Sequence, residues 1–364
     1  MTIYRILVRF ASLTALLGVG ALAACNDGAG DLPDEGSGGT GVTSSSSTTT
    51  SGASAGTGGA AVAELTWIAH LDPAAGELPE GLAVNPAGDS AFVGLAPTGK
   101  ILAIRLSDGK VSPFGSIPTP PPNGGYLLGM TFDKAGNLFA GVASSSAAYQ
   151  PGIFKVPAAG GPATLFASAP GLNFPNGLVF DDSGALLVTD SLSGIIFKID
   201  TKGVATKWAS DPLLVGDTKA ACANGAAFPI GANGIVVANG AAYVVNTDKG
   251  SLLKIAINGD GTAGAISTFV PSDCATLGGA DGLSADDDGS FLVAANGINA
   301  ITRVTADGKA SILVSKGKLD FPASTWITTG KGSKDLLITN AALKSAQTPG
   351  GMPTPGLLRF PLGG

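Results

Sequence analysis

The segment NGLVFDDSGALLVTDSLSGIIFKI, residues 176–199, contains the pattern that decides the fold. Asn-Gly and an apolar residue lead into a turn rich in Asp and Gly, which is followed by an apolar strand, a second turn and another strand. Asp and Gly favour such turns because they tolerate backbone angles that most residues avoid, and Val, Ile, Leu and Phe are typical of half-buried strands. The segment therefore predicts successive short strands of one antiparallel sheet.

The same pattern occurs six times along the chain. Its first residue, called the marker residue below, is Glu80, Leu128, Asn176, Asn233, Asp281 and Ala323 in the six copies. Successive markers are 48, 48, 57, 48 and 42 residues apart, and the sixth copy, Ala323-Ser324-Thr325, is the weakest. A repeat of this length, with short strands and turns of Gly and Asp, is typical of the four-stranded blades of a β-propeller.

The two ends of the repeat region complement each other. The last copy ends near Leu362 without an obvious fourth strand, whereas residues 64–71, ahead of the first copy, have the composition of a strand. We expect this N-terminal strand to complete the sixth blade, because such closure leaves no sheet edge exposed. The sequence thus predicts an all-β fold over residues 63–364: a six-bladed β-propeller of four-stranded antiparallel blades, closed by an N-terminal strand.

The N-terminus has the features of an export signal. Arg5 and Arg9 precede an uncharged apolar run over residues 10–24, which is shorter than the roughly 20 residues that span a membrane. Leu22-Ala23-Ala24-Cys25 resembles the lipobox of bacterial lipoproteins, in which the cysteine is acylated and becomes the mature N-terminus. An ordinary secretory signal is the alternative. We favour a lipoprotein signal peptide over residues 1–24, with lipidation at Cys25.

Residues 25–62 consist mostly of Gly, Ser, Thr and Ala and predict a flexible linker. The protein is therefore expected to be exported and anchored by lipid to a bacterial membrane, with its propeller in the periplasm or at the cell surface. Asn26 follows the cysteine in place of the Asp that marks inner-membrane retention in some bacteria, which favours the outer membrane.

Charge and cysteine content restrict the partners. The chain has 21 basic and 27 acidic residues, a formal charge of −6 and no basic cluster, which argues against nucleic acid. We expect a small-molecule partner, membrane contact through the lipid anchor only, and a monomer.

Cys222 and Cys274 precede two successive markers, so both should lie on the same face of neighbouring blades. An exported chain favours a disulfide between them over two free thiols.

The markers suggest a site at the centre of the ring. The innermost strand of each propeller blade starts at the mouth of the central channel, so Glu80, Asn176, Asn233 and Asp281 should converge there. All four offer oxygen atoms, which suits a hard divalent cation, calcium first, with zinc or magnesium as alternatives. The competing interpretation is that Asn and Asp serve local turns; Glu80 fits it least, because Glu is not a turn residue.

Over roughly residues 64–362 these positions resemble the senescence marker protein/gluconolactonase/luciferin-regenerating enzyme-like (regucalcin-like) propellers. In that family a Glu-Gly in the first blade, an Asn in the fourth and an Asp-Gly in the fifth bind a divalent metal, which implies Glu80, Asn233 and Asp281 as ligands. A third-blade Asn faces the substrate, and Asn176 takes that place. The string from Asn176 to Ser191 also looks like the family's fourth-blade motif, but blade order favours Asn233 as the ligand.

The chain departs from the family at two positions near Asn176. Members that act on sugar lactones have an Arg two residues before this Asn and an Asp directly after it, where this chain has Phe174 and Gly177. Leu128 adds a further apolar marker. The mouth of the channel should thus be more apolar than a sugar site, so the metal ligands are retained while specificity for a plain sugar lactone is not expected.

The resemblance implies a metal-dependent, gluconolactonase-like hydrolase of lactones or related esters. Asp281 would position or deprotonate the attacking water, and Asn176 would bind a substrate oxygen. A non-catalytic ligand- or protein-binding propeller on a membrane tether is the alternative, so enzyme activity stays open at this point.

The single histidine, His70, is expected in the closing strand, and no Gly-x-Ser-x-Gly motif or zinc-type Cys/His cluster is present. We expect four aromatic residues near the channel mouth, Tyr126, Phe174, Phe228 and Trp326, to pack between blade strands rather than line a pocket.

Overall fold

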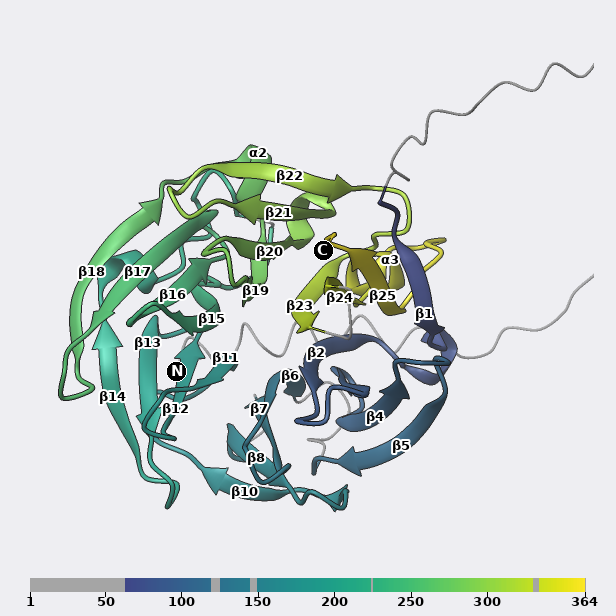
Figure 1. Ribbon diagram of the computed structural model, residues 1–364, viewed down its shortest axis with the longest axis horizontal. Coiled ribbons are helices and arrows are strands. Elements are labelled where there is room, and N and C mark those ends of the chain that lie inside the picture. Colours follow the sequence, from purple (N-terminus) through teal and green to yellow (C-terminus); the bar gives the residue numbers. More distant parts are fainter. Residues whose placement is uncertain (1–62, 119–124, 145–148, 224, 330–333, 364) are drawn as a thin grey trace, which may run out of the picture. The chain divides into compact units, whose positions relative to one another are not determined.

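Six antiparallel sheets are arranged around a central channel (Figure 1). The structure is a computed structural model that describes residues 63–118, 125–144, 149–223, 225–329 and 334–363. The predicted signal peptide, Cys25 and the predicted linker lie outside these residues. In the described parts of the chain, the helices are too short to span a membrane. The predicted six-bladed β-propeller is confirmed.

Each blade has four strands, numbered here from the channel outward. Blade 1 contains β2 (Pro79–Val84), β3 (Ser90–Leu95), β4 (Lys100–Arg105) and β5 (Val111–Ser116); blade 2 contains β6 (Gly125–Phe132), β7 (Leu138–Ser144), β8 (Gly152–Val156) and β10 (Thr164–Ala167); blade 3 contains β11 (Pro175–Phe180), β12 (Leu186–Asp190), β13 (Ile195–Ile199) and β14 (Ala205–Ser210). Blade 4 contains β15 (Ala232–Ala238), β16 (Ala241–Asn246), β17 (Ser251–Ile257) and β18 (Ala263–Val270); blade 5 contains β19 (Ala280–Ala285), β20 (Phe291–Ala295), β21 (Ala300–Val304) and β22 (Ala310–Ser315). The two-residue strand β9 (Gly161–Pro162) pairs with the outer strand β5 in parallel.

Blade 6 combines the two ends of the propeller sequence. It contains β23 (Pro322–Thr329), β24 (Lys334–Asn340), β25 (Gly356–Pro361) and, outermost, β1 (Thr66–His70). β1 is antiparallel to β25, with Thr66 opposite Arg359 and His70 opposite Gly356. The predicted closure of the ring by the N-terminal strand is therefore confirmed.

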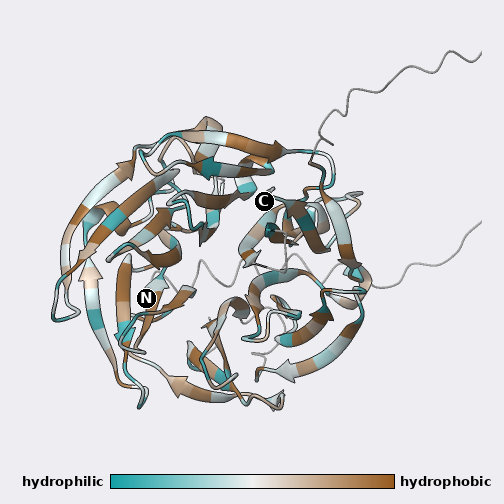
Figure 2. Ribbon diagram, in the orientation of Figure 1, coloured by the Kyte–Doolittle hydropathy of each residue, from teal (hydrophilic) through white to brown (hydrophobic). Residues whose placement is uncertain are grey.

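Apolar side chains fill the spaces between neighbouring blades. One buried cluster lies between each pair of adjacent blades, including blades 6 and 1, where Ala69 and Leu71 pack with Leu82 and Leu357. Figure 2 shows the corresponding hydrophobic residues along the strands. Because every blade is buried against two neighbours, the hydrophobic stabilisation is spread evenly around the ring.

The glycine that follows each of the first five markers sets the spacing of the innermost strands. A Cβ atom at any of these glycines would lie only 2.0–2.5 Å from the carbonyl oxygen of the next marker along the ring. The five positions are Gly81, Gly129, Gly177, Gly234 and Gly282. Only glycine permits so close an approach of two backbones. The repeated glycine therefore serves packing around the channel and not a local turn.

Threonine hydroxyls reinforce two of these contacts between blades. Thr189 Oγ1 accepts a hydrogen bond from Gly177 N (2.8 Å) and donates one to Asn233 O (2.6 Å). Thr339 Oγ1 contacts Ser324 N (2.8 Å) and Glu80 O (2.9 Å) in the same way, and thereby joins blade 6 to blade 1. The closing contact of the ring is thus built like an internal one.

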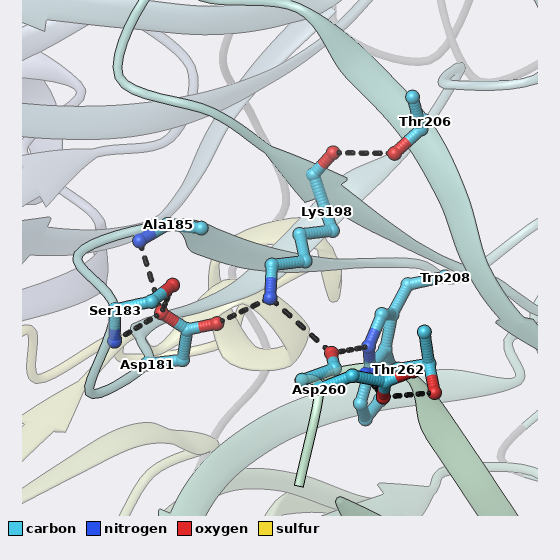
Figure 3. Close-up of polar contacts among 9 residues, drawn as sticks. Asp181, Ser183, Ala185, Lys198, Thr206, Trp208, Asp260 and Thr262 are labelled. Atoms are coloured by element: carbon cyan, nitrogen blue, oxygen red, sulfur yellow. Dashed lines mark hydrogen bonds and ion pairs between the residues drawn. The ribbon is translucent and has the colours of Figure 1, made fainter. Parts of the chain in front are cut away.

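Polar contacts also join blades away from the channel. Lys198 on β13 forms an ion pair with Asp181 (Nζ–Oδ2, 2.8 Å), as Figure 3 shows. It also donates a hydrogen bond to Gly261 O of blade 4 (3.2 Å). Trp208 Nε1 on β14 donates to the same oxygen (3.0 Å). Burial raises the pKa of Asp181, but hydrogen bonds from Lys198 and Ser183 outweigh it, so the pKa lies below its usual value.

Candidate functional site

Five of the six marker residues line one cavity of about 640 Å3, at the end of the channel where the innermost strands begin. They are Glu80, Leu128, Asn176, Asn233 and Asp281. The sixth marker, Ala323, is 1% exposed and is not among the residues that line this cavity. The four polar residues expected to converge are brought together.

Two buried carboxyl groups line this cavity. Glu80 begins blade 1 and Asp281 begins blade 5, and they are 6% and 7% exposed. Glu80 Oε2 has no hydrogen-bond partner among the described residues. Burial, and then the negative charge of Asp281, raise the pKa of the Glu80 carboxyl well above its usual value.

The carboxyl group of Asp281, unlike Glu80 Oε2, receives side-chain hydrogen bonds. Burial raises its pKa to about 7, although hydrogen bonds from Asn296 and Asn233 act in the opposite direction. Asn296 Nδ2 donates to Asp281 Oδ2 over 2.8 Å. Among the described residues no cation pairs with either carboxyl group in an ion pair. Their mutual repulsion is therefore not compensated by the protein itself.

A second layer of polar residues holds the markers of blades 3, 4 and 5. Asn176 Nδ2 donates to Ser191 Oγ (3.3 Å), and Asn233 Nδ2 donates to Thr247 Oγ1 (3.0 Å). Ser191, Thr247 and Asn296 each directly follow the second strand of their blade. Sequence reasoning missed these three residues, although their shared place in the repeat is a readable signal. In Asn176 and Asn233 the side-chain nitrogen donates these hydrogen bonds, and the side-chain oxygen takes no part in them.

The other three blades present alanine at this place. Strand register aligns Ala96, Ala143 and Ala341 with Ser191, Thr247 and Asn296. The polar half of the site thus belongs to blades 3 to 5, together with Glu80 from blade 1. The remaining side is apolar at both levels, since the markers of blades 2 and 6 are Leu128 and Ala323.

An apolar cluster lines the side formed by blades 2 and 3. Its members are Tyr126, Leu128, Ala143, Phe174, Leu192 and Phe228, and this set is called the apolar wall below. Tyr126, Phe174 and Phe228 line the cavity, so the expectation that they pack between strands is wrong. Trp326 does pack against the clusters between blades 6, 1 and 2, and it borders a second cavity of about 280 Å3 further along the channel.

Segments outside the blades complete the walls. A disulfide joins Cys222, in the connection from β14 to β15, to Cys274, the first residue of the short helix α2 (Cys274–Leu277). Both cysteines border the cavity, as does helix α3 (Leu343–Gln347) of blade 6. The first of these segments accounts for the longer spacing of 57 residues between the third and fourth markers. The contribution of α3 was not predicted, although an unusually long gap separates the last two strands of the sixth copy.

The donor set of the site fits a hard cation. In the described part of the chain, no three side chains of His, Cys, Asp or Glu form a cluster, so further protein ligands beside Glu80 and Asp281 would be amide oxygens. Asn233 is placed to supply one, and the unpartnered Glu80 oxygen is a vacant donor. Carboxylate and amide oxygens in a flexible mixture are what calcium binds, with water filling the remaining positions. His70 is exposed on β1 and does not border the cavity.

Comparisons with known proteins establish the fold. No family model matches the sequence, and no curated protein matches it either. Among solved structures, a putative gluconolactonase is 16% identical and matches with a TM-score of 0.59, covering 83% of this chain and 93% of that one. The calcium-binding protein regucalcin from Agrobacterium tumefaciens is 18% identical, with a TM-score of 0.55 and coverages of 79% and 92%.

A further neighbour carries out a different reaction. A virginiamycin B lyase from Staphylococcus aureus, solved as a catalytically inactive His-to-Ala variant with quinupristin, is 18% identical and matches with a TM-score of 0.51. The match covers 77% of this chain and 82% of the lyase. At these identities the likenesses show the propeller fold, which supports many unrelated functions.

Proposed function

We propose that the protein is a metal-dependent hydrolase of lactones or related esters. The observation that carries the proposal is the pair of buried carboxyl groups, Glu80 and Asp281, which share one cavity without a protein cation. Burying two unpaired carboxyl groups is costly, and such perturbed groups are typical of functional sites. The neighbours support the proposal: one is described as a putative gluconolactonase, and regucalcin, which has the same fold, is described as calcium-binding.

Glu80, Asn233 and Asp281 would hold the ion, which we propose to be calcium. A bound divalent ion supplies Lewis acidity that polarises the carbonyl group of a lactone or ester. Asp281 accepts a proton from the water that attacks the carbonyl carbon; the bond from this carbon to the ring or ester oxygen then breaks, and the proton is passed to the departing alkoxide. Asn176, fixed by Ser191, binds a substrate oxygen.

The chain lacks what the lyase neighbour needs. The solved lyase is described as inactive when one histidine is changed to alanine, whereas the single histidine here lies on the outermost strand of blade 6. This observation argues against the same histidine-dependent reaction in this cavity. The second candidate function is ligand binding without catalysis, which the large apolar wall would also serve.

We further propose that the protein acts outside the cytoplasm, anchored by lipid at Cys25 and tethered by residues 26–62. The disulfide between Cys222 and Cys274 supports an oxidising compartment. Labelled palmitate should be incorporated in cells that express the wild type but not the Cys25→Ser variant; equal incorporation in both would contradict the anchor.

Metal-dependent melting tests the site directly. Calcium should raise the Tm of the purified protein above its value in chelator, by an amount equivalent to about 2.7 kcal/mol at 100 times the Kd. The Glu80→Gln/Asp281→Asn variant should show no shift. Glu64→Gln/Asp182→Asn, which removes one exposed Glu and one exposed Asp, is the matched control and should respond like the wild type. If no divalent ion shifts the wild type, the hydrolase proposal fails and ligand binding becomes the better candidate.

A further inference from the structure

The apolar wall is distinct from the cores that hold the blades together. Leu128, Ala143 and Phe174 are buried, and they form their own cluster with the half-buried side chains of Tyr126, Leu192 and Phe228. The rings of Phe174 and Phe228 are tilted toward each other with centroids 5.6 Å apart, although Phe228 comes from the connection between blades 3 and 4. Four of the six residues border the cavity. Side chains arranged in this way leave apolar surface facing a hollow where a ligand would cover it.

The wall lies across the cavity from one carboxyl group and beside the other. Blades follow one another around the ring in sequence order, so Leu128 of blade 2 lies opposite Asp281 of blade 5 and next to Glu80 of blade 1. A carbonyl group held at Glu80 and Asp281 would therefore have the rest of its molecule directed toward the wall.

The phenol of Tyr126 is the one side-chain hydrogen-bonding group among the six wall residues. Alanine occupies the second polar level in blades 1, 2 and 6, at Ala96, Ala143 and Ala341. On the opposite half, the amide nitrogens of Asn176 and Asn233 already donate to Ser191 and Thr247. A polyhydroxylated ring placed against the wall would lose hydrogen bonds to water without replacing them, which disfavours its binding.

We infer that the substrate is a lactone or ester with an alkyl or aryl arm of several carbons, which binds across Leu128, Phe174 and Phe228. The reacting group rests on the proposed function, whereas the preference for an apolar arm rests on the wall alone. These three residues would then determine specificity: they select the arm, and the carboxyl pair acts on the carbonyl end.

Substrates that differ only in arm length test the inference. Hydrolysis of γ-butyrolactone, γ-octalactone, γ-decalactone and δ-gluconolactone is followed in a pH-stat with calcium present. We expect kcat/KM to rise about fourfold for each methylene buried against the wall, and gluconolactone to be the poorest substrate. Binding of the corresponding γ-alkyl lactams, measured by calorimetry, should rise with arm length in the same way without any reaction.

Two substitutions locate the effect on the wall. Leu128→Asn and Phe228→Asn should each reduce the preference for decalactone over butyrolactone, and for the matching lactams, by about tenfold. Phe228→Asn guards against misfolding of the Leu128 variant, because Phe228 lies outside the blade strands. Leu165→Asn, the same change as Leu128→Asn at a 44% exposed position of the outer strand β10, should leave the preference unchanged.

The outcomes distinguish binding of the apolar arm at the wall from hydrolysis at the carboxyl pair. Equal binding of all arm lengths, stronger binding of gluconolactone, absence of lactam binding, or an unchanged preference in both wall variants would overturn the inference. Lactam binding that rises with arm length and depends on Leu128 and Phe228, but with no hydrolysis of any lactone, would support the wall as a binding surface while overturning the proposed hydrolase.

Discussion

Glu80 illustrates what a single residue contributes at the scale of the site. A glutamate at the start of a strand has no local reason to be there, so its type alone pointed to the channel. Its environment was not readable from the sequence, because it depends on Asp281, about 200 residues further along the chain. Desolvation and the repulsion between these two groups arise only when blades 1 and 5 are placed around one axis.

Removing one charge should therefore stabilise the metal-free protein. We expect Glu80→Gln to raise the free energy of unfolding by about 1–3 kcal/mol in chelator at pH 8, because a buried carboxylate without a partner is replaced by a neutral amide. Urea unfolding with and without calcium measures this effect. The same variant should lose the gain in stability from calcium. Destabilisation by Glu80→Gln in chelator would show that the carboxylate has a partner in the folded protein.

The carboxyl pair also gives the metal-free protein a characteristic pH dependence. Burial raises the pKa of Asp281 to about 7 and raises that of Glu80 as well, whereas carboxyl groups of the unfolded chain titrate near pH 4. Between these values the folded chain binds more protons than the unfolded chain. The contribution of this pair to the free energy of unfolding should therefore be fully present below about pH 4 and be lost as the pH rises through 7.

Melting in chelator across this range tests the dependence, and Glu80→Gln/Asp281→Asn provides the comparison. The decrease attributable to the pair is the difference between the two curves. Curves that run parallel from pH 4 to 8 would contradict it.

At the scale of elements, the repeated marker and glycine were sufficient to place the innermost strands. Their role was only partly predictable: a glycine after Asn or Asp suggests a turn, yet Gly177 and Gly234 are strand residues that allow backbones of neighbouring blades to touch. Ser191, Thr247 and Asn296 were missed for a related reason. Each follows a second strand, where a polar residue has no distinctive local signature, and its function becomes visible only when the marker beside it is known.

The threonine bridges between blades should contribute measurably to stability. Thr339→Val keeps the shape of the side chain but removes the hydroxyl that links Ser324 N to Glu80 O. We expect a loss of about 1–2 kcal/mol in the free energy of unfolding, because a buried backbone group loses its partner. Thr206→Val, the same change on the exposed side of β14, should have little effect. Equal effects of the two substitutions would show that the bridge contributes nothing to closure.

At the scale of the whole molecule, the sequence predicted the number of blades and the closing strand, because a period of about 48 residues leaves few other architectures. It did not predict the shape of the cavity. The apolar wall combines strands of blades 2 and 3 with Phe228 from an irregular connection, and no local pattern indicates such a meeting.

The closing strand should be necessary for a stable monomer. Removal of residues 1–71 exposes the edge of β25 and part of the cluster formed by Ala69 and Leu71. We expect this variant to self-associate through the free edge, as measured by light scattering after size-exclusion chromatography. A variant that lacks only residues 1–62 keeps β1 and should remain monomeric. A monomer of unchanged Tm after removal of β1 would contradict the role of the closure.

The pairing of β1 with β25 also sets the order of events when the protein is made. Thr66 and Arg359 face each other although they lie 293 positions apart in the sequence, so this pair can form only after the last strand has been synthesised. Contacts between residues so distant in sequence form slowly, because the entropy of closing the loop must be overcome first. Until then blade 6 remains incomplete. The growing polypeptide therefore cannot close its ring on the ribosome. If the protein is exported as proposed, the chain would still be open when it reaches a translocation pore.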